Sequence, residues 1–174
     1  MLKKDEIMDR MRMMKDRGIT LIELIIVISI IGIVAVALGF EFNGWMGGYR
    51  VESQTKEVYV DLMNARARAM ERNRVHLVDF PSATQYRIRE DTDEDNVPDT
   101  ILPSFPKTVQ YTLNCNGAGI LATSFSFDTR GLVSPNRTLW FTLPANVNPD
   151  YDCIVIFSTR INMGKWNGAS CDAK

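Results

Sequence analysis

The chain has 174 residues, of which 45% are hydrophobic, and its formal net charge is −1. This length is enough for one ordinary globular domain with an attached element, and the apolar content excludes an intrinsically disordered chain. The near-neutral charge gives no overall signal for nucleic-acid binding, although a local basic patch stays open.

The amino-terminal region combines a charged leader with a long apolar run. Residues 1–18 contain six basic and four acidic side chains, a net charge of +2. The apolar run extends from Ile19 to about Phe42, and its stretch from Leu24 to Phe40 contains no charged residue. A helix of about 20 residues rises about 30 Å, which is the thickness of a bilayer core. Because basic residues stay on the cytoplasmic side, we expect a single span with the rest of the chain outside.

Gly18 lies before the apolar run, whereas an ordinary secretory signal peptide has its small-residue cleavage site after the apolar core. A cut after Gly18 would remove only the leader and would leave Ile19 as the first residue of the helix. Glycine suits a protease cleft because it has no side chain and no restriction on φ. The rival interpretation is an uncleaved signal anchor on an extracytoplasmic protein.

Glu23 is the one carboxylate within the first turns of the apolar run. Deep in a bilayer it would cost roughly 2.5–3.5 kcal/mol, and such residues are functional by default. Cleavage would create a free amine on Ile19, four residues earlier. We therefore expect Glu23 to neutralise the amine of a neighbouring subunit and to set the axial register of packed helices. The alternative is a carboxylate that reaches water from a helix end.

The segment Gly18-Ile19-Thr20-Leu21-Ile22-Glu23-Leu24 resembles the class III signal of type IV prepilins and type II secretion pseudopilins. The resemblance implies that a membrane-embedded aspartyl prepilin peptidase cuts after the glycine and N-methylates the new first residue. The family's glutamate, fifth in the mature chain, matches Glu23. Ile19 replaces the usual phenylalanine, and Phe40 stands where major pilins often have a kinking proline. A straighter helix suits a minor subunit or a pseudopilin.

A second helical segment is expected from about Val51 to Asn73, after a glycine-rich stretch that we interpret as a flexible joint. Its apolar residues recur every three or four positions and form one stripe, which would pack on a sheet or a neighbouring helix. The joint contains Gly39, Gly44, Gly47 and Gly48, and the stripe contains Val51, Thr55, Val58, Leu62, Ala65 and Ala69.

Four arginines gather toward the end of this helix, at positions 66, 68, 72 and 74. We interpret them as favourable charge at a helix carboxyl end with a solvated face. A DNA or phospholipid patch is the weaker alternative, because Asp61 and Glu71 dilute the cluster.

After Asn73 the sequence changes to short runs rich in Val, Ile, Phe, Tyr and Thr, separated by Pro, Gly, Asn and Asp, which predicts strands. The expected strands are Val75–Phe80, Gln85–Glu90, Thr108–Asn114, Ser124–Phe127, Thr138–Leu143 and Ile154–Ser158. The predicted fold class is therefore α+β, with a long amino-terminal helix packed on a carboxy-terminal antiparallel β-sheet domain.

The three cysteines show no C-x-x-C spacing, and the single histidine is distant in sequence, so a zinc site is not expected. Outside the cytoplasm a disulfide would be stable, and we favour Cys153 with Cys171 because it would tie the last segment to the preceding strand. Burial of all three cysteines in reduced form stays open.

Asp91, Asp93, Asp95 and Asp99 form the densest polar cluster, and the spacing of the first three resembles the start of a calcium loop. Asn96 stands at the position of the turn glycine, and Leu102 stands at the closing position, so we prefer a solvent-exposed acidic turn to calcium binding. Apart from that calcium, no cofactor is expected.

No catalytic set emerges, and the protein is not expected to be an enzyme. His76 lies between Val75 and Leu77, where a packed or exposed strand histidine is the simplest interpretation.

Further segments resemble the GspH/FimT group of pseudopilins: Asp61–Asn73, the acidic turn, Phe125–Gly131 and Ile154–Ile161. The resemblance implies a type IV pilin-like fold and a minor subunit of a type II secretion pseudopilus or a type IV pilus. Its partners would be other pilins, the prepilin peptidase, the inner membrane and secreted cargo, with the globular domain in the periplasm.

The expected divisions of the chain are a cleaved leader (1–18), a membrane and assembly helix (19–42), the glycine joint with the amphipathic helix (43–74) and a β-rich domain (75–174). The alternative function is a DNA-binding minor pilin for DNA uptake that uses Arg160 and Lys165. Of the basic Gly-Arg-x-Arg tail of such proteins, only Arg160 is matched.

Overall fold

The computed structural model describes residues 19–93, 95, 97–116 and 124–174, without the side chains of residues 37–43. The leader, including Gly18, lies outside the described residues. The chain divides into two units at Phe42 and Asn43, and each unit is considered by itself.

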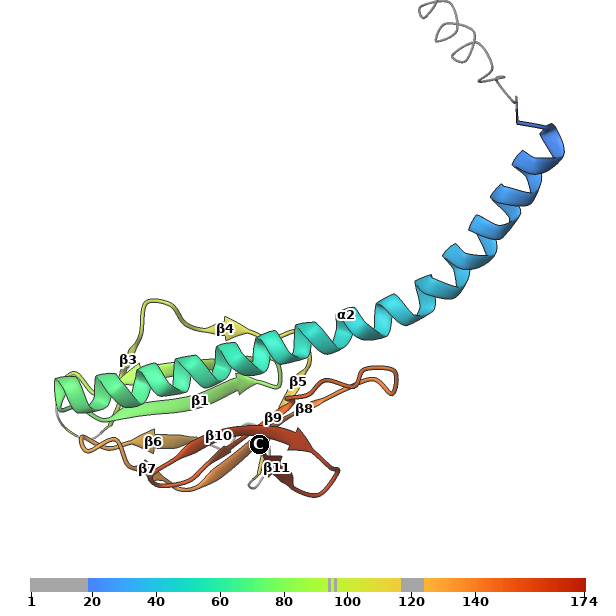
Figure 1. The fold of residues 1–174 in the computed structure, drawn as a ribbon. Helices are drawn as coiled ribbons and strands as arrows, with labels where there is room; N and C mark the ends of the chain where they lie inside the picture. The colour runs from blue at the N-terminus through green and yellow to red at the C-terminus, as the bar shows by residue number, and fades with distance from the viewer. Residues whose placement is uncertain (1–18, 94, 96, 117–123) are drawn as a thin grey trace, which may run out of the picture. The chain divides into compact units, whose positions relative to one another are not determined.

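One helix, α2 (Leu21–Arg72, 52 residues), belongs to both units (Figure 1). It ends at Asn73, whose φ of 55° is left-handed, and the Arg74 N–H donates to the Ala69 carbonyl over 3.2 Å. Asparagine tolerates this conformation better than most residues, and the hydrogen bond satisfies a carbonyl at the helix end.

The region of the predicted glycine joint is helical around residues 44–48. A Cβ on Gly44 would lie 2.9 Å from the Asn146 carbonyl oxygen, and a Cβ on Gly47 would lie 2.7 Å from Val147 Cγ2. At these two positions glycine therefore lets the loop before β9 approach the helix.

The second unit contains eleven described strands in two antiparallel sheets. The first sheet has the order β3-β2-β1-β6-β7, and β4 also pairs with β2. Its strands are β1 (His76–Ser82), β2 (Gln85–Glu90), β3 (Thr100–Ile101), β4 (Lys107–Thr108), β6 (Phe125–Phe127) and β7 (Val133–Ser134). The helix runs along β1 (Figure 1).

The second sheet has the order β11-β10-β9-β8-β5. Its strands are β5 (Thr112–Cys115), β8 (Arg137–Thr142), β9 (Cys153–Ile156), β10 (Ile161–Trp166) and β11 (Cys171–Ala173). Two backbone hydrogen bonds join the sheets: the Leu113 N–H donates to the Ala83 carbonyl over 2.8 Å, and the Val133 N–H donates to the Ser158 carbonyl over 3.0 Å.

The helix and both sheets contribute to one hydrophobic core. The stripe predicted on the helix is buried, from Val51 to Ala69, and it packs with the inward side chains of the two sheets. Tyr86, Phe125 and Phe127 are the largest fully buried side chains. The predicted α+β fold, with a helix packed on an antiparallel β domain, is confirmed.

The predicted strands differ from the observed ones in the region of Thr108–Asn114 and in the number of strands and sheets. Thr108–Asn114 was expected to be one strand, but it supplies β4 to the first sheet and β5 to the second. Four strands, β3, β7, β10 and β11, were not predicted, and the single expected sheet is in fact two sheets.

The carboxy-terminal strand is held by a disulfide between Cys153 and Cys171, whose Cα atoms are 6.0 Å apart. Cys115 is buried and lies outside this disulfide, and its Sγ donates to the Asn116 carbonyl over 3.8 Å. Because β11 folds tightly onto β10, a Cβ on Gly164 would overlap the backbone of Asp172 and would lie 2.9 Å from the Ala173 Cα. Glycine at this position therefore permits the close approach that brings Cys171 to Cys153.

Candidate assembly site and buried polar clusters

The start of α2 is capped by Thr20. Its hydroxyl accepts a hydrogen bond from the Glu23 N–H over 3.2 Å, and its carbonyl accepts one from the Leu24 N–H over 3.1 Å. Thr20-x-x-Glu23 is the sequence pattern of a capping box, in which the third helical residue is Glu or Gln. Glu23 also lies in the first turn, where a negative charge interacts favourably with the helix dipole.

The first unit presents an apolar surface on every side of its helix. All side chains from Ile19 to Val36 are exposed, and the large apolar ones range from 47% exposed at Val27 to 75% at Leu21. The Ser29 hydroxyl donates to the Ile25 carbonyl over 2.7 Å, so this polar group is satisfied within the helix. We predicted a span over residues 19–42; within the part of the chain that the structure describes, no helix is both long enough and apolar enough to cross a membrane.

The second unit exposes a further apolar surface on α2, which we call the outer stripe. It consists of Val60, Met63, Ala67 and Met70, at alternating spacings of three and four residues. Val60 is 52% exposed, Met63 is 38% exposed and Met70 is 48% exposed, while the buried stripe lies on another side of the same helix. A 3–4 spacing of apolar residues is typical of a seam between packed helices.

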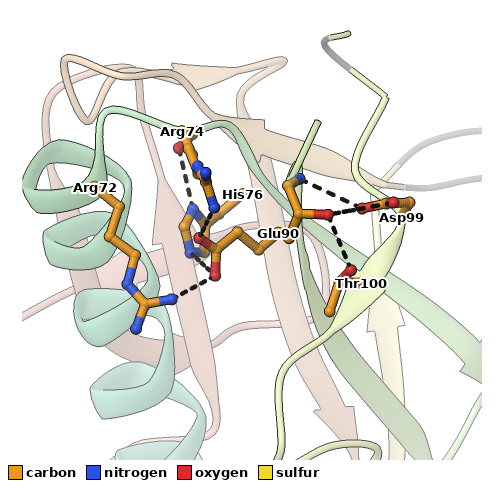
Figure 2. Close-up of polar contacts among 7 residues, drawn as sticks. Arg72, Arg74, His76, Glu90, Asp99 and Thr100 are labelled. Carbon is orange, nitrogen blue, oxygen red and sulfur yellow. Dashed lines mark hydrogen bonds and ion pairs between the residues drawn. The ribbon is translucent and has the colours of Figure 1, made fainter. Parts of the chain in front are cut away.

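Glu90 lies at the centre of a buried ionic cluster beside the end of α2 (Figure 2). Its side chain is only 4% exposed, and its carboxylate accepts from Arg72 Nη1 over 2.7 Å and from Arg74 Nη1 over 3.5 Å. A buried carboxylate needs such partners, because burial of an unpaired charge is costly. Two of the four arginines that we placed on a solvated helix face therefore pair with this carboxylate.

His76 completes this cluster and is fully buried. Its Nδ1 lies 3.1 Å from the Arg74 carbonyl, so that nitrogen donates, and its Nε2 lies 4.0 Å from a Glu90 carboxylate oxygen with no hydrogen-bond partner. Burial lowers the pKa of His76 below its ordinary value of 6.5, helped by Arg72 and Arg68 and opposed by the Arg74 carbonyl and Glu90. His76 is thus a packed strand histidine, one of the two possibilities that the sequence left open.

The acidic loop brings three of the four predicted cation ligands together. One ligand oxygen each from Asp91, Asp93 and Asp95 lies within 4.8 Å of the others. Asp91 is 2% exposed, whereas the other two are exposed. Partial loss of hydration in the loop and the negative charge of the neighbouring Asp95 raise the pKa of Asp93. Glu94 and Asn96, the residue at the turn-glycine position, lie outside the described residues.

The carboxylate of Asp99, the fourth predicted ligand, accepts hydrogen bonds from within the loop itself. It accepts from the Thr92 hydroxyl over 3.0 Å, and these hydrogen bonds lower its pKa (Figure 2). Asp99 is therefore engaged by Thr92, whereas the carboxylates of Asp91, Asp93 and Asp95 lie close to one another.

The residues predicted for DNA binding are not brought together. Arg160 precedes β10 and lies 5.0 Å from the centre of the Phe157 ring, and Lys165 near the other end of β10 donates to Asn148 over 2.5 Å. Five residues of extended strand separate them by about 16 Å.

The Glu90 cluster was missed by sequence reasoning, although a signal for it exists. In β2 the burial alternates, so Glu90 falls on the same inward face as Tyr86 and Ile88. The same alternation in β1 puts His76 inward with Val78. A charged residue at an inward position of a strand predicts a buried partner.

Residues 13–39 match the family model described as the prokaryotic N-terminal methylation motif. No curated protein and no solved structure matches the chain. The motif indicates a type IV pilin-like structural subunit, rather than an enzyme, that is processed by a prepilin peptidase, anchored in the inner membrane and assembled with other pilins.

Proposed function

We propose that this chain is a minor subunit of a type II secretion pseudopilus or a type IV pilus, of the GspH/FimT type, positioned near the filament tip. A prepilin peptidase cuts after Gly18 and methylates the amine of Ile19. The apolar half of α2 lies in the inner membrane as a single pass before assembly, and the β domain lies in the periplasm, where it contacts other subunits and secreted cargo.

The observation on which this proposal chiefly rests is the exposed apolar helix with a single carboxylate in its first turn. Every side chain from Ile19 to Val36 is exposed, so this surface requires a cover of lipid or of other helices. Glu23 has the one acidic or basic side chain between Ile19 and Val36. In a filament its charge pairs with the methylated amine of the adjacent subunit, which fixes the axial register.

The outer stripe supports the same function in the second unit. Val60 and Met63 are apolar, exposed and spaced as in a helix–helix seam. A neighbouring helical subunit would cover them, so both units supply surface to the assembly.

A minor role is supported by the absence of proline between Ile19 and Arg72, since bulk pilins often have a proline kink in this helix. We prefer protein assembly to DNA uptake because Arg72 and Arg74 are paired with Glu90, while Arg160 and Lys165 lie apart. A basic patch that binds DNA requires several unpaired cations in one place.

The test is expression of the full chain in bacteria with and without an active prepilin peptidase, followed by intact-mass analysis of the membrane fraction. We expect the mass of residues 19–174 plus one methyl group when the peptidase is present, and the full mass when it is absent. Gly18→Val should block the cut, and Thr20→Val serves as a matched control with an unchanged cleavage residue. Retention of residues 1–18 in peptidase-positive cells would overturn the proposal and favour an uncleaved anchor.

Filament incorporation distinguishes a subunit of a secretion pseudopilus from a subunit of a type IV pilus. Sheared filaments of a secretion-competent and of a piliated host should contain the processed chain in low amount in only one of the two. A salt-sensitive, tight complex of the full chain with duplex DNA would instead favour the DNA-uptake alternative.

A further inference from the structure

A stacked pair of tryptophans lies on the face of the second sheet that points away from the core. The rings of Trp140 (β8) and Trp166 (β10) have centroids 4.4 Å apart and planes 6° from parallel. Both side chains are only partly buried, whereas Leu139 and Phe141 on the other face of β8 are buried. Because the rings are stacked face to face, each indole covers one face of the other, and the outer faces and edges of the pair form an apolar wall outside the hydrophobic core.

This wall is one side of a groove with a volume of about 370 Å³. The other side is the segment between β8 and β9, which includes Val147 and Pro149. The volume falls in the range of small-molecule sites, which are usually largely apolar with a few polar groups in fixed positions.

Three polar side chains provide such groups at the rim. Lys165 Nζ donates to Asn148 Oδ1 over 2.5 Å, and Asp152 Oδ1 accepts from the backbone N–H of Trp166 over 2.5 Å. Asp152 is 6% exposed, and burial raises the pKa of its carboxyl group. One ammonium and one carboxylate leave the rim without net charge when both are ionised.

The groove is held in place from two directions. Trp140 lies opposite Cys153 in the strand register, and Cys153 is bonded to Cys171. The loop is fixed to α2 by the hydrogen bond from the Asp150 N–H to Glu52, 2.8 Å long. A site that is already ordered loses less entropy when a ligand binds.

We propose that this groove binds a neutral pyranose ring of an oligosaccharide. A pyranose has an apolar face of C–H bonds, which matches the outer face of one indole of the stacked pair, and a rim of hydroxyls, which match the carboxylate of Asp152, the amide of Asn148 and the ammonium of Lys165. This binding function is additional to filament assembly and does not depend on it.

Two other ligand classes fit less well. A proline-rich peptide would also stack on indoles, but it offers few donors to a carboxylate. A nucleic acid needs net positive charge along its phosphates, and here Asp152 offsets Lys165. The polar rim therefore favours the sugar.

The experiment is a titration of the full chain, in a detergent without a sugar headgroup, with chitotriose and with maltotriose. Trp45→Phe removes the exposed tryptophan of α2, so that the fluorescence reports on Trp140 and Trp166. We expect a saturable fluorescence change with at least one trisaccharide, a loss of affinity of about tenfold or more in Trp166→Ala, and a smaller loss in Trp166→Phe, which keeps a flat ring. Asn162→Ala, on the same strand face but outside the groove, is the matched control.

Folding is checked by circular dichroism and by labelling under denaturing conditions, which should detect one thiol outside the disulfide. If Trp166→Ala does not fold, Lys165→Met and Asn148→Ala test the rim with the tryptophans intact, and each should weaken binding. The proposal is overturned if neither trisaccharide binds at roughly 10 mM, or if binding is unchanged in the folded variants. Saturable binding of a polyproline peptide or of single-stranded DNA in place of both sugars would also overturn it.

Discussion

The backbone N–H of Glu23 donates to the hydroxyl of Thr20, which makes these two residues the cap of the apolar helix. Two roles of Glu23 can therefore be tested separately: its position matches a capping box, and its charge is the one that we propose for an intersubunit ion pair. The two roles respond differently to substitution, because glutamine retains the capping geometry but not the charge.

Glu23→Gln should abolish or strongly reduce incorporation into filaments, while cleavage after Gly18 continues. Thr20→Ala should cost about 1 kcal/mol of helix stability and reduce incorporation only mildly. The measurements are the ratio of processed to unprocessed chain in membranes and the amount in sheared filaments. If Glu23→Gln assembles normally and Thr20→Ala does not, the glutamate acts as a cap alone.

Gly164→Ala should destabilise the second unit by about 1–3 kcal/mol, because the added methyl group meets the backbone of Asp172. The strand β11 would then be held away from β10, and the thiols of Cys153 and Cys171 would be oxidised more slowly. Urea unfolding followed by circular dichroism and thiol labelling after refolding measure both effects. Asn162→Ala, also on β10, should change the unfolding midpoint little, and an equal loss in both variants would contradict this account of Gly164.

The strands that the sequence predicted well are those with a regular alternation of burial. Gln85–Glu90 was predicted with the observed bounds, because Tyr86 and Ile88 alternate with polar residues. The strand β10 was missed because Gly164 interrupts its apolar pattern, and the reason for that glycine is the close approach of the next strand, β11. Thr108–Asn114 was expected as one strand, but the N–H groups of Val109 and Leu113 donate to the β1–β2 turn, and the chain changes sheets between them.

The site shows the same contrast between local and distant signals. The motif for which we propose cleavage and assembly is visible in the sequence because Gly18, Ile19 and Glu23 lie within six residues. The Glu90 cluster depends on the register of β1 with β2, which pairs His76 with Glu90. No short motif encodes that pairing, so only the inward position of a charged residue could have indicated it.

His76 should make the folded state less stable in mild acid. Burial lowers its pKa in the folded protein below 6.5, so the unfolded chain binds the proton more readily. The free energy of unfolding should therefore fall as the pH decreases from the ordinary pKa of histidine toward the lowered value in the fold. The measurement is urea unfolding of the full chain in detergent across this pH range.

His76→Gln is the matched variant for this prediction. It should be less dependent on pH in that range, whatever its absolute stability, because the titrating group is gone. The difference between the two pH profiles isolates His76 from Asp152, whose raised pKa has the opposite effect on stability at lower pH. A wild-type chain that becomes more stable in mild acid relative to His76→Gln would show that Glu90 holds the proton on His76 in the fold.

Calcium binding at the acidic loop stays a prediction, and the geometry defines how to test it. If the three carboxylates of Asp91, Asp93 and Asp95 are ligands, calcium should bind with a dissociation constant on the order of 0.1–1 mM, the range of weak extracellular sites. Calorimetry of the chelator-treated full chain with calcium and with magnesium measures this. Asp93→Asn with Asp95→Asn should abolish the heat, whereas Asp99→Asn should retain it because Asp99 is occupied by Thr92. No calcium-specific heat in the wild type would leave the loop as an exposed acidic turn.

The outer stripe gives a test of assembly that leaves processing and folding intact. Met63→Glu places a charge at the centre of the exposed apolar surface, so it should prevent packing against a neighbouring helix and reduce incorporation into filaments. Because Met63 is already 38% exposed, the free energy of unfolding should change by no more than about 0.5 kcal/mol. Asn64→Glu adds the same charge to the next residue, which is exposed but lies off the stripe, and it should incorporate normally. Equal incorporation of the two variants would mean that the outer stripe stays uncovered in the filament and that assembly depends on the first unit alone.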